Sequence, residues 1–190
     1  MQQLTEIRWH ARAGQGAVTA AKLVADTALE LDQYIQAMPE YGPERMGAPI
    51  QAFTRLSPEP IEIHNNIEDP DVVVVLDESL LPIVDVARGL TAEGTIIVNT
   101  CKTPEEIRRE LGIDQGHIAT VDASGISLDT LKRDIPNTPM IGALAKVTGL
   151  FTLAQVADHL RKSFGKKFAQ EIVDANVASV TRAYEEVAFV

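Results

Sequence analysis

The chain has 190 residues, of which 45% are hydrophobic and 23% are charged, and its formal net charge is −10. This length and balance predict one globular domain spanning residues 1–190 and argue against a disordered chain. The acidic excess argues against a nucleic-acid partner, and no apolar run approaches the ~18 residues that a membrane span needs. The one basic cluster, "RKSFGKK" at residues 161–167, is interpreted as the solvated end of a helix.

Cysteine usage limits the metal and redox chemistry of the chain, because Cys101 is its single cysteine. One cysteine excludes a disulfide within these residues, and also a zinc or iron–sulfur site built from cysteines of this chain alone. It is compatible with a reducing compartment, and the N-terminal "MQQLTEIRWH" lacks the apolar stretch of a signal peptide. We therefore expect a cytoplasmic protein that holds no cluster of its own.

The first third of the chain combines strands with one helix and a long loop. Residues 17–31 are rich in Ala, Leu and Val with polar interruptions, which predicts a helix packed by one face. Three prolines and two glycines in residues 39–50 predict a long loop. The strands predicted here are residues 6–10, 34–38, 51–57 and, as an edge strand that tolerates prolines, 58–65.

The rest of the chain alternates apolar β-branched runs with helical patterns and ends in helices. The predicted strands are residues 71–77, 93–100 and 117–124. The predicted helices are residues 78–90 with Pro82 in the first turn, 103–111 with Thr103 as N-cap and Pro104 following it, 141–149, 153–164 and 167–187. This order predicts an α/β fold, a three-layer Rossmann-like and mostly parallel sheet with helices on both faces and a helical C-terminus.

A glycine turn between the first strand and the first helix is the main candidate site. Gly14 and Gly16 precede a helix N-terminus, which favours anions, and Arg12 adds positive charge. The dinucleotide-binding fingerprint is incomplete, because its third glycine position is Thr19 and no acidic residue clearly follows the second strand before Glu40. On these residues alone the turn is either an anion site or a tight corner without a ligand.

Other polar residues have ordinary structural interpretations beside functional ones. Asp77 ends a buried strand, where it either meets a ligand or caps the next helix. His10 is interpreted as a structural histidine, Cys101 as a half-buried small residue and Ser124 as a turn or helix cap. The four histidines show no metal-like spacing.

Three motifs together resemble a known family. They are "ARAGQGAVTAAKLVA" at residues 11–25, "PEYGPERMGAPIQAFTRLS" at 39–57 and "PNTPMIGALAKVTG" at 136–149. The chain resembles, over essentially its whole length, the gamma subunit of pyruvate:ferredoxin oxidoreductase and of related 2-oxoacid:ferredoxin oxidoreductases. Family members more usually carry glycine where Ala11 and Ala13 stand here, which slightly stiffens the turn.

The resemblance implies a multisubunit enzyme that converts pyruvate to acetyl-CoA with ferredoxin as electron acceptor. Alpha and beta subunits build the thiamine diphosphate site, and a ferredoxin-like delta subunit carries iron–sulfur clusters. The gamma subunit carries neither, is not catalytic alone, covers the active site and helps to bind coenzyme A. The residues expected to contact coenzyme A are Arg12, Gly14, Gln15, Gly16, Arg45 and Gly47. Residues 38–49 also suit a subunit contact.

Several alternatives stay open at this stage. The substrate of the assembly could be 2-oxoisovalerate, 2-oxoglutarate or indolepyruvate instead of pyruvate. The chain could also be a purely structural assembly subunit with an empty glycine turn. A third alternative is a free-standing nucleotide-dependent oxidoreductase.

Overall fold

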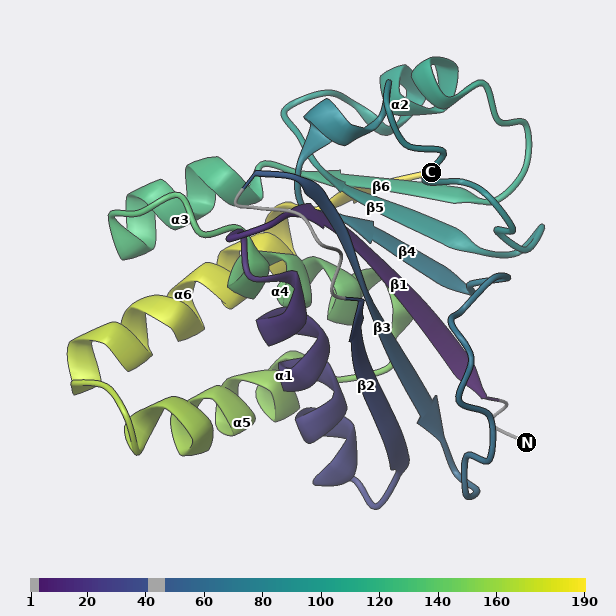
Figure 1. Ribbon diagram of the computed structural model, residues 1–190. Helices are drawn as coiled ribbons and strands as arrows, with labels where there is room; N and C mark the ends of the chain where they lie inside the picture. Colours follow the sequence, from purple (N-terminus) through teal and green to yellow (C-terminus); the bar gives the residue numbers. More distant parts are fainter. Residues whose placement is uncertain (1–3, 41–46) are drawn as a thin grey trace.

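The computed structural model of the chain describes residues 4–40 and 47–190. Seven strands in these ranges form one sheet in the order β2–β3–β1–β4–β5–β6–β7 (Figure 1). The strands are β1 (Thr5–Arg12), β2 (Tyr34–Glu40), β3 (Pro49–Ser57), β4 (Val72–Val75), β5 (Thr95–Asn99), β6 (His117–Val121) and β7 (Ala188–Phe189).

The centre of the sheet is parallel and its edges are antiparallel. β1, β4, β5 and β6 run in the same direction, whereas β3 and β2 on one side and β7 on the other are antiparallel to their neighbours. The connection between β2 and β3 is too short for a parallel crossover, which requires about a dozen residues or more. The predicted α/β class is confirmed, with an antiparallel pair added at one edge.

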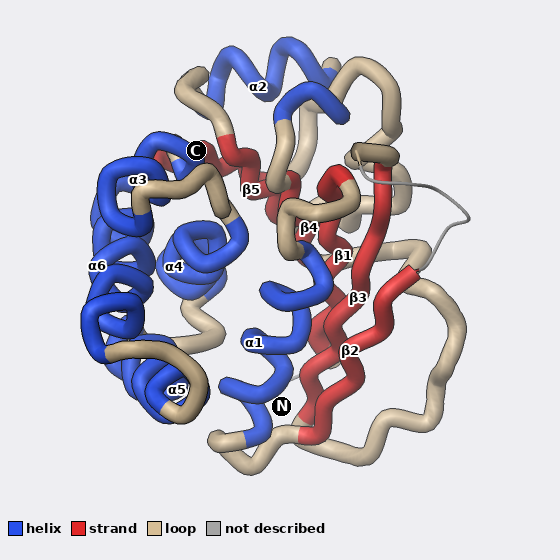
Figure 2. Tube along the Cα trace, turned by 60° about the vertical axis from the view of Figure 1, so that its left-hand side comes forward, coloured by secondary structure: helices blue, strands red, loops and turns tan. Residues whose placement is uncertain are grey.

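Helices cover both faces of this sheet, as predicted. They are α1 (Ala17–Leu29), α2 (Pro104–Leu111), α3 (Ala123–Leu131), α4 (Asn137–Thr148), α5 (Leu153–Gly165) and α6 (Gln170–Glu186), with a short 3-10 turn η1 (Glu78–Leu80). Figure 2 shows α1, α4, α5 and α6 gathered on one side of the sheet. No helix in the described residues has the length and apolar character needed to cross a bilayer.

Two apolar cores lie on opposite faces of the sheet. The larger core packs Val72 and Val74 of β4 against α1, α4 and α6. The smaller core packs Val73 and Val75 against Ile107 of α2 and against the segment that follows β4. All four valines of β4 are buried, which is typical of a strand covered on both faces.

Local capping fixes where several helices begin and end. Thr103 caps α2 in a reciprocal capping box with Glu106, and Pro104 occupies the first helical position, as predicted. Thr152 forms a second capping box with Gln155 at the start of α5. Gly149 ends α4 in the left-handed conformation that glycine adopts without strain.

The predicted helix at residues 78–90 is wrong, because only Glu78–Leu80 forms a short 3-10 turn and irregular turns follow. The buried side chain of Arg8 in β1 gives the physical reason. Its guanidinium donates to the carbonyls of Val86 and Arg88. A helix continuing to Leu90 would need the Val86 carbonyl for its own bond from the Leu90 amide, whereas here the Leu90 amide donates to the Ala87 carbonyl.

Other predicted boundaries also change. Residues 58–65 form no strand, and instead the buried Arg55 donates to the Ile63 carbonyl and to Asn65. The predicted loop at 39–50 is shorter, because β2 extends to Glu40 and β3 begins at Pro49. Residues 41–46 of that loop, and the interpretations placed on them, lie outside the described residues.

Two elements were absent from the sequence prediction. α3 begins directly after β6, where Asp122 accepts a hydrogen bond from the Gly125 amide and caps the helix. Ser124 therefore lies in the first turn of a helix that the sequence pattern did not reveal. β7 is a two-residue strand that pairs with β6 close to the C-terminus.

Candidate functional site

The glycine turn lies at the carboxyl end of the parallel strands, between β1 and β4. The chain leaves β1 toward α1 on one face of the sheet, whereas the segment after β4 packs on the other face. Neighbouring parallel strands whose connections leave in opposite directions open a crevice, and α/β proteins use such crevices for ligands. The turn predicted from the glycine spacing therefore occupies a ligand-binding position of the fold.

Hydrogen bonds within the turn give it a fixed shape. The Gln15 amide donates to the Arg12 carbonyl at 3.1 Å, and the Arg12 amide donates to Gln15 Oε1 at 2.7 Å. Gly14 and Gly16 have φ values of 102° and 86°, which non-glycine residues rarely adopt. Gly16 is the N-cap of α1 and supplies no side-chain cap, so the helix dipole points its positive end at this turn.

Asp77 is bound directly to the turn from the end of β4. Gln15 Nε2 donates to Asp77 Oδ2 at 2.8 Å, and Arg12 Nε lies 3.4 Å from the same oxygen. The Ser79 amide donates to Asp77 Oδ1 at 3.0 Å, so the carboxylate also caps η1. Burial acts to raise the pKa of Asp77, but the hydrogen bonds from Ser79 and Gln15 and the charge of Arg12 outweigh it and lower the pKa.

Arg12 joins three segments and is not a free cation. Its Nε and Nη2 donate to Ser79 Oγ at 3.0 and 2.9 Å, and its Nη1 donates to the Gly47 carbonyl at 3.0 Å. The Gly47 amide also donates to the Ala13 carbonyl at 3.2 Å, which continues the ladder between β1 and β3. The charge of Arg12 is therefore partly neutralised by Asp77 before any ligand arrives.

Of the remaining residues predicted to contact coenzyme A, all but Arg45 lie in the described part of the chain. Gly14, Gln15, Gly16 and Gly47 lie together around the turn. Gly47 has a φ of 90°, which requires glycine, and among the described residues a Cβ atom there would meet nothing within 4 Å. Arg45 lies outside the described residues, two positions before Gly47.

A cavity of about 250 Å³ adjoins the turn along the ends of β4, β5 and β6. Its lining is polar and includes the four carboxylates of Asp77, Glu78, Asp122 and Asp134. The other lining residues are Gln15, Leu76, Asn99, Thr100, Cys101 and Ser124. Asn99 organises its floor, because its Nδ2 donates to the Leu76 carbonyl and to Ser124 Oγ while its Oδ1 accepts from the Ser124 amide. This acidic lining favours cations and hydrogen-bond donors over phosphate.

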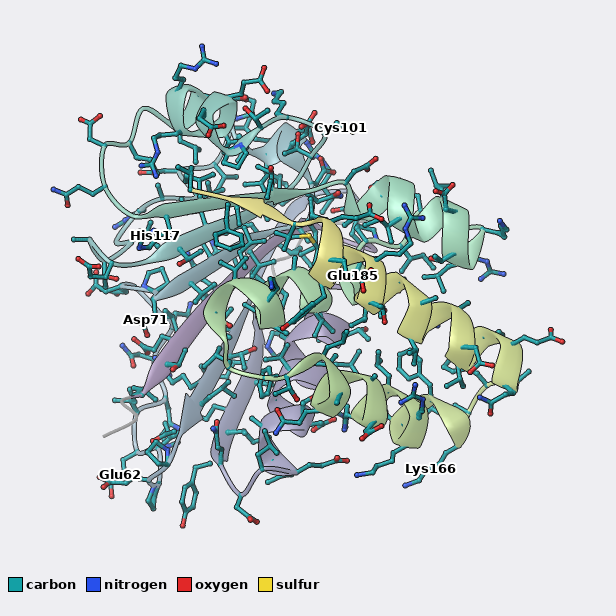
Figure 3. All side chains as sticks on the ribbon, turned by 180° about the vertical axis from the view of Figure 1, so that it is seen from behind. Glu62, Asp71, Cys101, His117, Lys166 and Glu185 are labelled. Carbon is teal, nitrogen blue, oxygen red and sulfur yellow. The ribbon has the colours of Figure 1, made fainter. Side chains whose placement is uncertain are left out.

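The described lining of the cavity is not arranged as a reactive thiol or as a metal site. Cys101 is exposed and not half-buried as predicted, and the charge of Asp122 raises the pKa of its thiol, which disfavours the thiolate. Within the described ranges, no group of three or more His, Cys, Asp or Glu side chains is arranged to hold a metal ion. Figure 3 shows Cys101 far from Lys166, so the basic cluster at the C-terminal end of α5 is not part of this site.

The structure adds neighbours of the turn that the sequence analysis did not identify. Ser79 receives two hydrogen bonds from Arg12, although 67 positions separate them. Asn137, the first residue of α4, lies directly against Gly16. Asn137 belongs to the third motif of the sequence analysis, which was the only available signal that it could be near the site.

Comparisons with known proteins agree over nearly the whole chain. The profile of the family described as pyruvate ferredoxin/flavodoxin oxidoreductase matches residues 6–186. A relative named pyruvate synthase subunit PorC, from Thermotoga maritima, is 50% identical over 96% of this chain and 94% of its own length. A relative from Thermococcus kodakarensis, named pyruvate/ketoisovalerate oxidoreductases common subunit gamma, is 48% identical over 90% of this chain and 95% of its own.

Solved structures show the same fold. The crystal structure of pyruvate oxidoreductase subunit PORC from Thermotoga maritima superposes with a TM-score of 0.88 at 46% identity, covering 99% of each chain. A 2-oxoglutarate:ferredoxin oxidoreductase from Magnetococcus marinus, solved with 2-oxoglutarate, coenzyme A and succinyl-CoA bound, has a TM-score of 0.76 at 17% identity. This chain covers 31% of that longer chain, so the second similarity concerns one of its parts and shows the fold alone.

Proposed function

Because this chain belongs to the pyruvate ferredoxin/flavodoxin oxidoreductase family, we propose that it is the gamma subunit of a pyruvate:ferredoxin oxidoreductase. The observation that carries this proposal is the 50% sequence identity to a pyruvate synthase subunit over 96% of this chain. The assembled enzyme would decarboxylate pyruvate oxidatively, form acetyl-CoA and pass the electrons to ferredoxin. Thiamine diphosphate and iron–sulfur clusters would reside in the alpha, beta and delta partners.

The chain's own part in this reaction is to bind and position, and not to perform the bond-making steps. Its single cysteine cannot hold a cluster alone, and the thiol is biased toward its protonated form. We assign it the covering of the active site and the binding of part of coenzyme A. The N-terminus of α1, which has no side-chain cap, supports this assignment, because pyrophosphate binds well at such helix ends.

The charges around the turn divide the proposed contacts into two kinds. Gly14, Gln15 and Gly16 present the positive end of α1, and Arg45 would bring a guanidinium to the phosphates. Arg12 and Gly47 are bonded to one another, so they would act mainly by holding the loop that carries Arg45. The acidic cavity beyond Asp77 would repel phosphate and so restrict it to the α1 side of the turn.

A second candidate function is a gamma subunit shared by two oxidoreductases. The relative from Thermococcus kodakarensis is named as a common subunit of pyruvate and ketoisovalerate enzymes, and it is nearly as similar as the pyruvate synthase subunit. A shared subunit would leave substrate selection to the other chains of each complex. Gamma subunits of 2-oxoglutarate or indolepyruvate enzymes and a purely structural subunit are further outcomes of the same test.

The test is an anaerobic pull-down of the tagged full-length chain from its native host. The partners would be identified by mass, and the eluate would be assayed for coenzyme A-dependent dye reduction with each 2-oxoacid. A thiamine-binding pair and a cysteine-rich ferredoxin-like chain, with activity on pyruvate, would support the proposal. Two alpha–beta pairs with activity on two acids would support the shared subunit, and a chain that elutes alone and binds a dinucleotide would refute both.

The proposed coenzyme A contact is tested at Arg45 in the assembled complex. We expect Arg45→Ala to weaken coenzyme A binding roughly tenfold, because charge-assisted bonds to phosphate contribute about 1.5–3 kcal/mol. Isothermal titration would measure the dissociation constant. Arg161→Ala is the matched control, since Arg161 is exposed and paired with Asp158 on α5. An unchanged constant for Arg45→Ala would remove Arg45 from the site.

A further inference from the structure

Asn137 is a buried polar residue at the meeting point of two helix N-termini. Its exposed fraction is 6%, and it is the first residue of α4, directly beside the first residues of α1. The Thr138 amide donates to Asn137 Oδ1 at 2.8 Å. Because this bond fixes the oxygen of the carboxamide toward α4, its NH2 group is directed at the glycine turn.

The contact between Asn137 and the turn is close. Asn137 Nδ2 lies 3.5 Å from the Gly16 carbonyl oxygen, and a Cβ atom on residue 16 would lie only 2.5 Å from that nitrogen. Glycine at position 16 is therefore required twice, for its φ of 86° and for the space that Asn137 fills. This pairing joins residues 121 positions apart in the chain.

The hydrogen-bond donors at this point exceed the acceptors. The NH2 group has two hydrogens, and its one acceptor in the described part of the chain is the Gly16 carbonyl, at the outer limit of hydrogen-bond distance. Gly16 gives α1 no side-chain cap. A buried amide donor without a good acceptor costs free energy, and native proteins rarely keep one without a use. Donors in excess of acceptors fit an acceptor-only group such as a phosphate oxygen.

We propose that Asn137 Nδ2 and the N-terminus of α1 together donate to a phosphate oxygen of the coenzyme A pyrophosphate. This inference rests on the proposed function and adds a binding residue from α4 to the glycine turn. Gly16 then lies next to both donors, because it is the N-cap of α1 and contacts Asn137. On the side of the turn that faces β4, the Asp77 carboxylate accepts a hydrogen bond from the Gln15 side chain.

The test is Asn137→Asp in the assembled enzyme. The substitution keeps the size of the side chain and the acceptor for the Thr138 amide, but it replaces the NH2 group with a negatively charged oxygen. We expect the KM for coenzyme A to rise at least tenfold, with the KM for pyruvate and kcat at saturating coenzyme A unchanged within twofold. The inhibition constant of 3′-phospho-ADP, which carries the pyrophosphate without the pantetheine arm, should rise by the same factor.

Two further variants keep the result interpretable. Asn176→Asp is the control, because Asn176 is a similarly buried helical asparagine on α6, and it should leave the KM for coenzyme A unchanged. If Asn137→Asp fails to assemble, Asn137→Ala removes the donor without adding charge and should raise the same two constants roughly fivefold. A parallel rise in the KM for pyruvate would show a merely structural role and overturn the inference.

The comparison with Arg45→Ala separates this inference from the proposed function. If Arg45→Ala raises the KM for coenzyme A and the Asn137 variants do not, Asn137 is not a ligand and the proposed function stands. If neither substitution changes the KM for coenzyme A or the inhibition constant of 3′-phospho-ADP, the glycine turn does not bind coenzyme A, and both statements fail together.

Discussion

His10 illustrates how burial sets the protonation state of a single residue. Its exposed fraction is 2%, and Arg8 Nε donates to its Nε2 at 3.2 Å. The ring must therefore be neutral with an unprotonated Nε2. Burial first, and the adjacent charge of Arg8 second, lower the pKa of His10 to about 3. The structural role expected for this histidine agrees with these contacts.

The low pKa of His10 predicts that the fold loses stability in mild acid. The unfolded chain binds a proton at this histidine below about pH 6.5, whereas the folded chain does not until about pH 3. Since the unfolded state binds more protons in this window, stability falls as the pH is lowered through it. We expect His10 to account for a loss of about 2 kcal/mol between pH 7 and pH 5.

Urea unfolding of the full chain at both pH values measures this effect. His10→Gln keeps an acceptor for Arg8 but does not titrate, so the variant should lose about 2 kcal/mol less than the wild type between pH 7 and pH 5. His64→Gln is the matched control, because it makes the same substitution at an exposed histidine. Equal losses in the wild type and in His10→Gln would contradict the prediction.

At the scale of elements, the contact between α4 and α6 depends on one glycine. A Cβ atom on Gly142 of α4 would lie 2.2 Å from the Val180 carbonyl oxygen of α6. A backbone atom cannot move aside as the end of a flexible side chain can. Both helices contribute to the larger core, so a separation of their axes would loosen the packing over the sheet.

Gly142→Ala is therefore expected to destabilise the chain by about 2–3 kcal/mol, as overpacking substitutions do. The free energy of unfolding in urea is the measurement. Gly165→Ala provides a matched control within a helix, because a Cβ atom on Gly165 meets nothing within 4 Å. That control should be neutral or stabilising by ~0.5 kcal/mol. A small effect of Gly142→Ala would mean that α6 shifts away at little cost.

The elements that could be predicted from sequence are those set by local pattern. The β-branched run of β4 and the Thr103 cap of α2 were both recognisable, because their causes lie within a few residues. Residues 78–90 have a helical pattern as well, yet the buried Arg8 donates hydrogen bonds to the carbonyls of Val86 and Arg88. These residues lie 78 and 80 positions away from Arg8 in the sequence. No periodicity within the segment could reveal that competition.

The same distinction holds for the candidate site. The spacing of Gly14 and Gly16 predicted a turn before a helix, which the structure shows. The bonds from this turn to Asp77, Ser79 and Asn137 were not predictable, because sheet order and helix packing bring them together across 62 to 121 positions. Asp77 in particular required knowledge that β4, and not the second strand of the sequence, is the parallel neighbour of β1.

At the scale of the whole molecule, the two faces of the sheet are stabilised unequally. The larger core is shared by β1, α1, α4 and α6, whose residues come from both ends of the chain. The smaller core is covered by the eight-residue α2 and the irregular segment after β4. Local opening costs least where few buried apolar side chains hold an element in place.

This asymmetry predicts two classes of backbone amide in hydrogen exchange. Amides of α2 should exchange through local opening at a lower free energy than amides of α4 and β4, which should exchange only when the whole chain unfolds. Mass spectrometry would follow exchange in peptides from residues 103–112 and 137–148 at several urea concentrations. The free energy of the opening that permits exchange should fall only slightly with urea for the first peptide and steeply for the second. The glycine turn joins β1 to α1 within the larger core, so its donors would keep their positions while the opposite layer opens. Equal protection of both peptides would show that the two faces unfold as one unit.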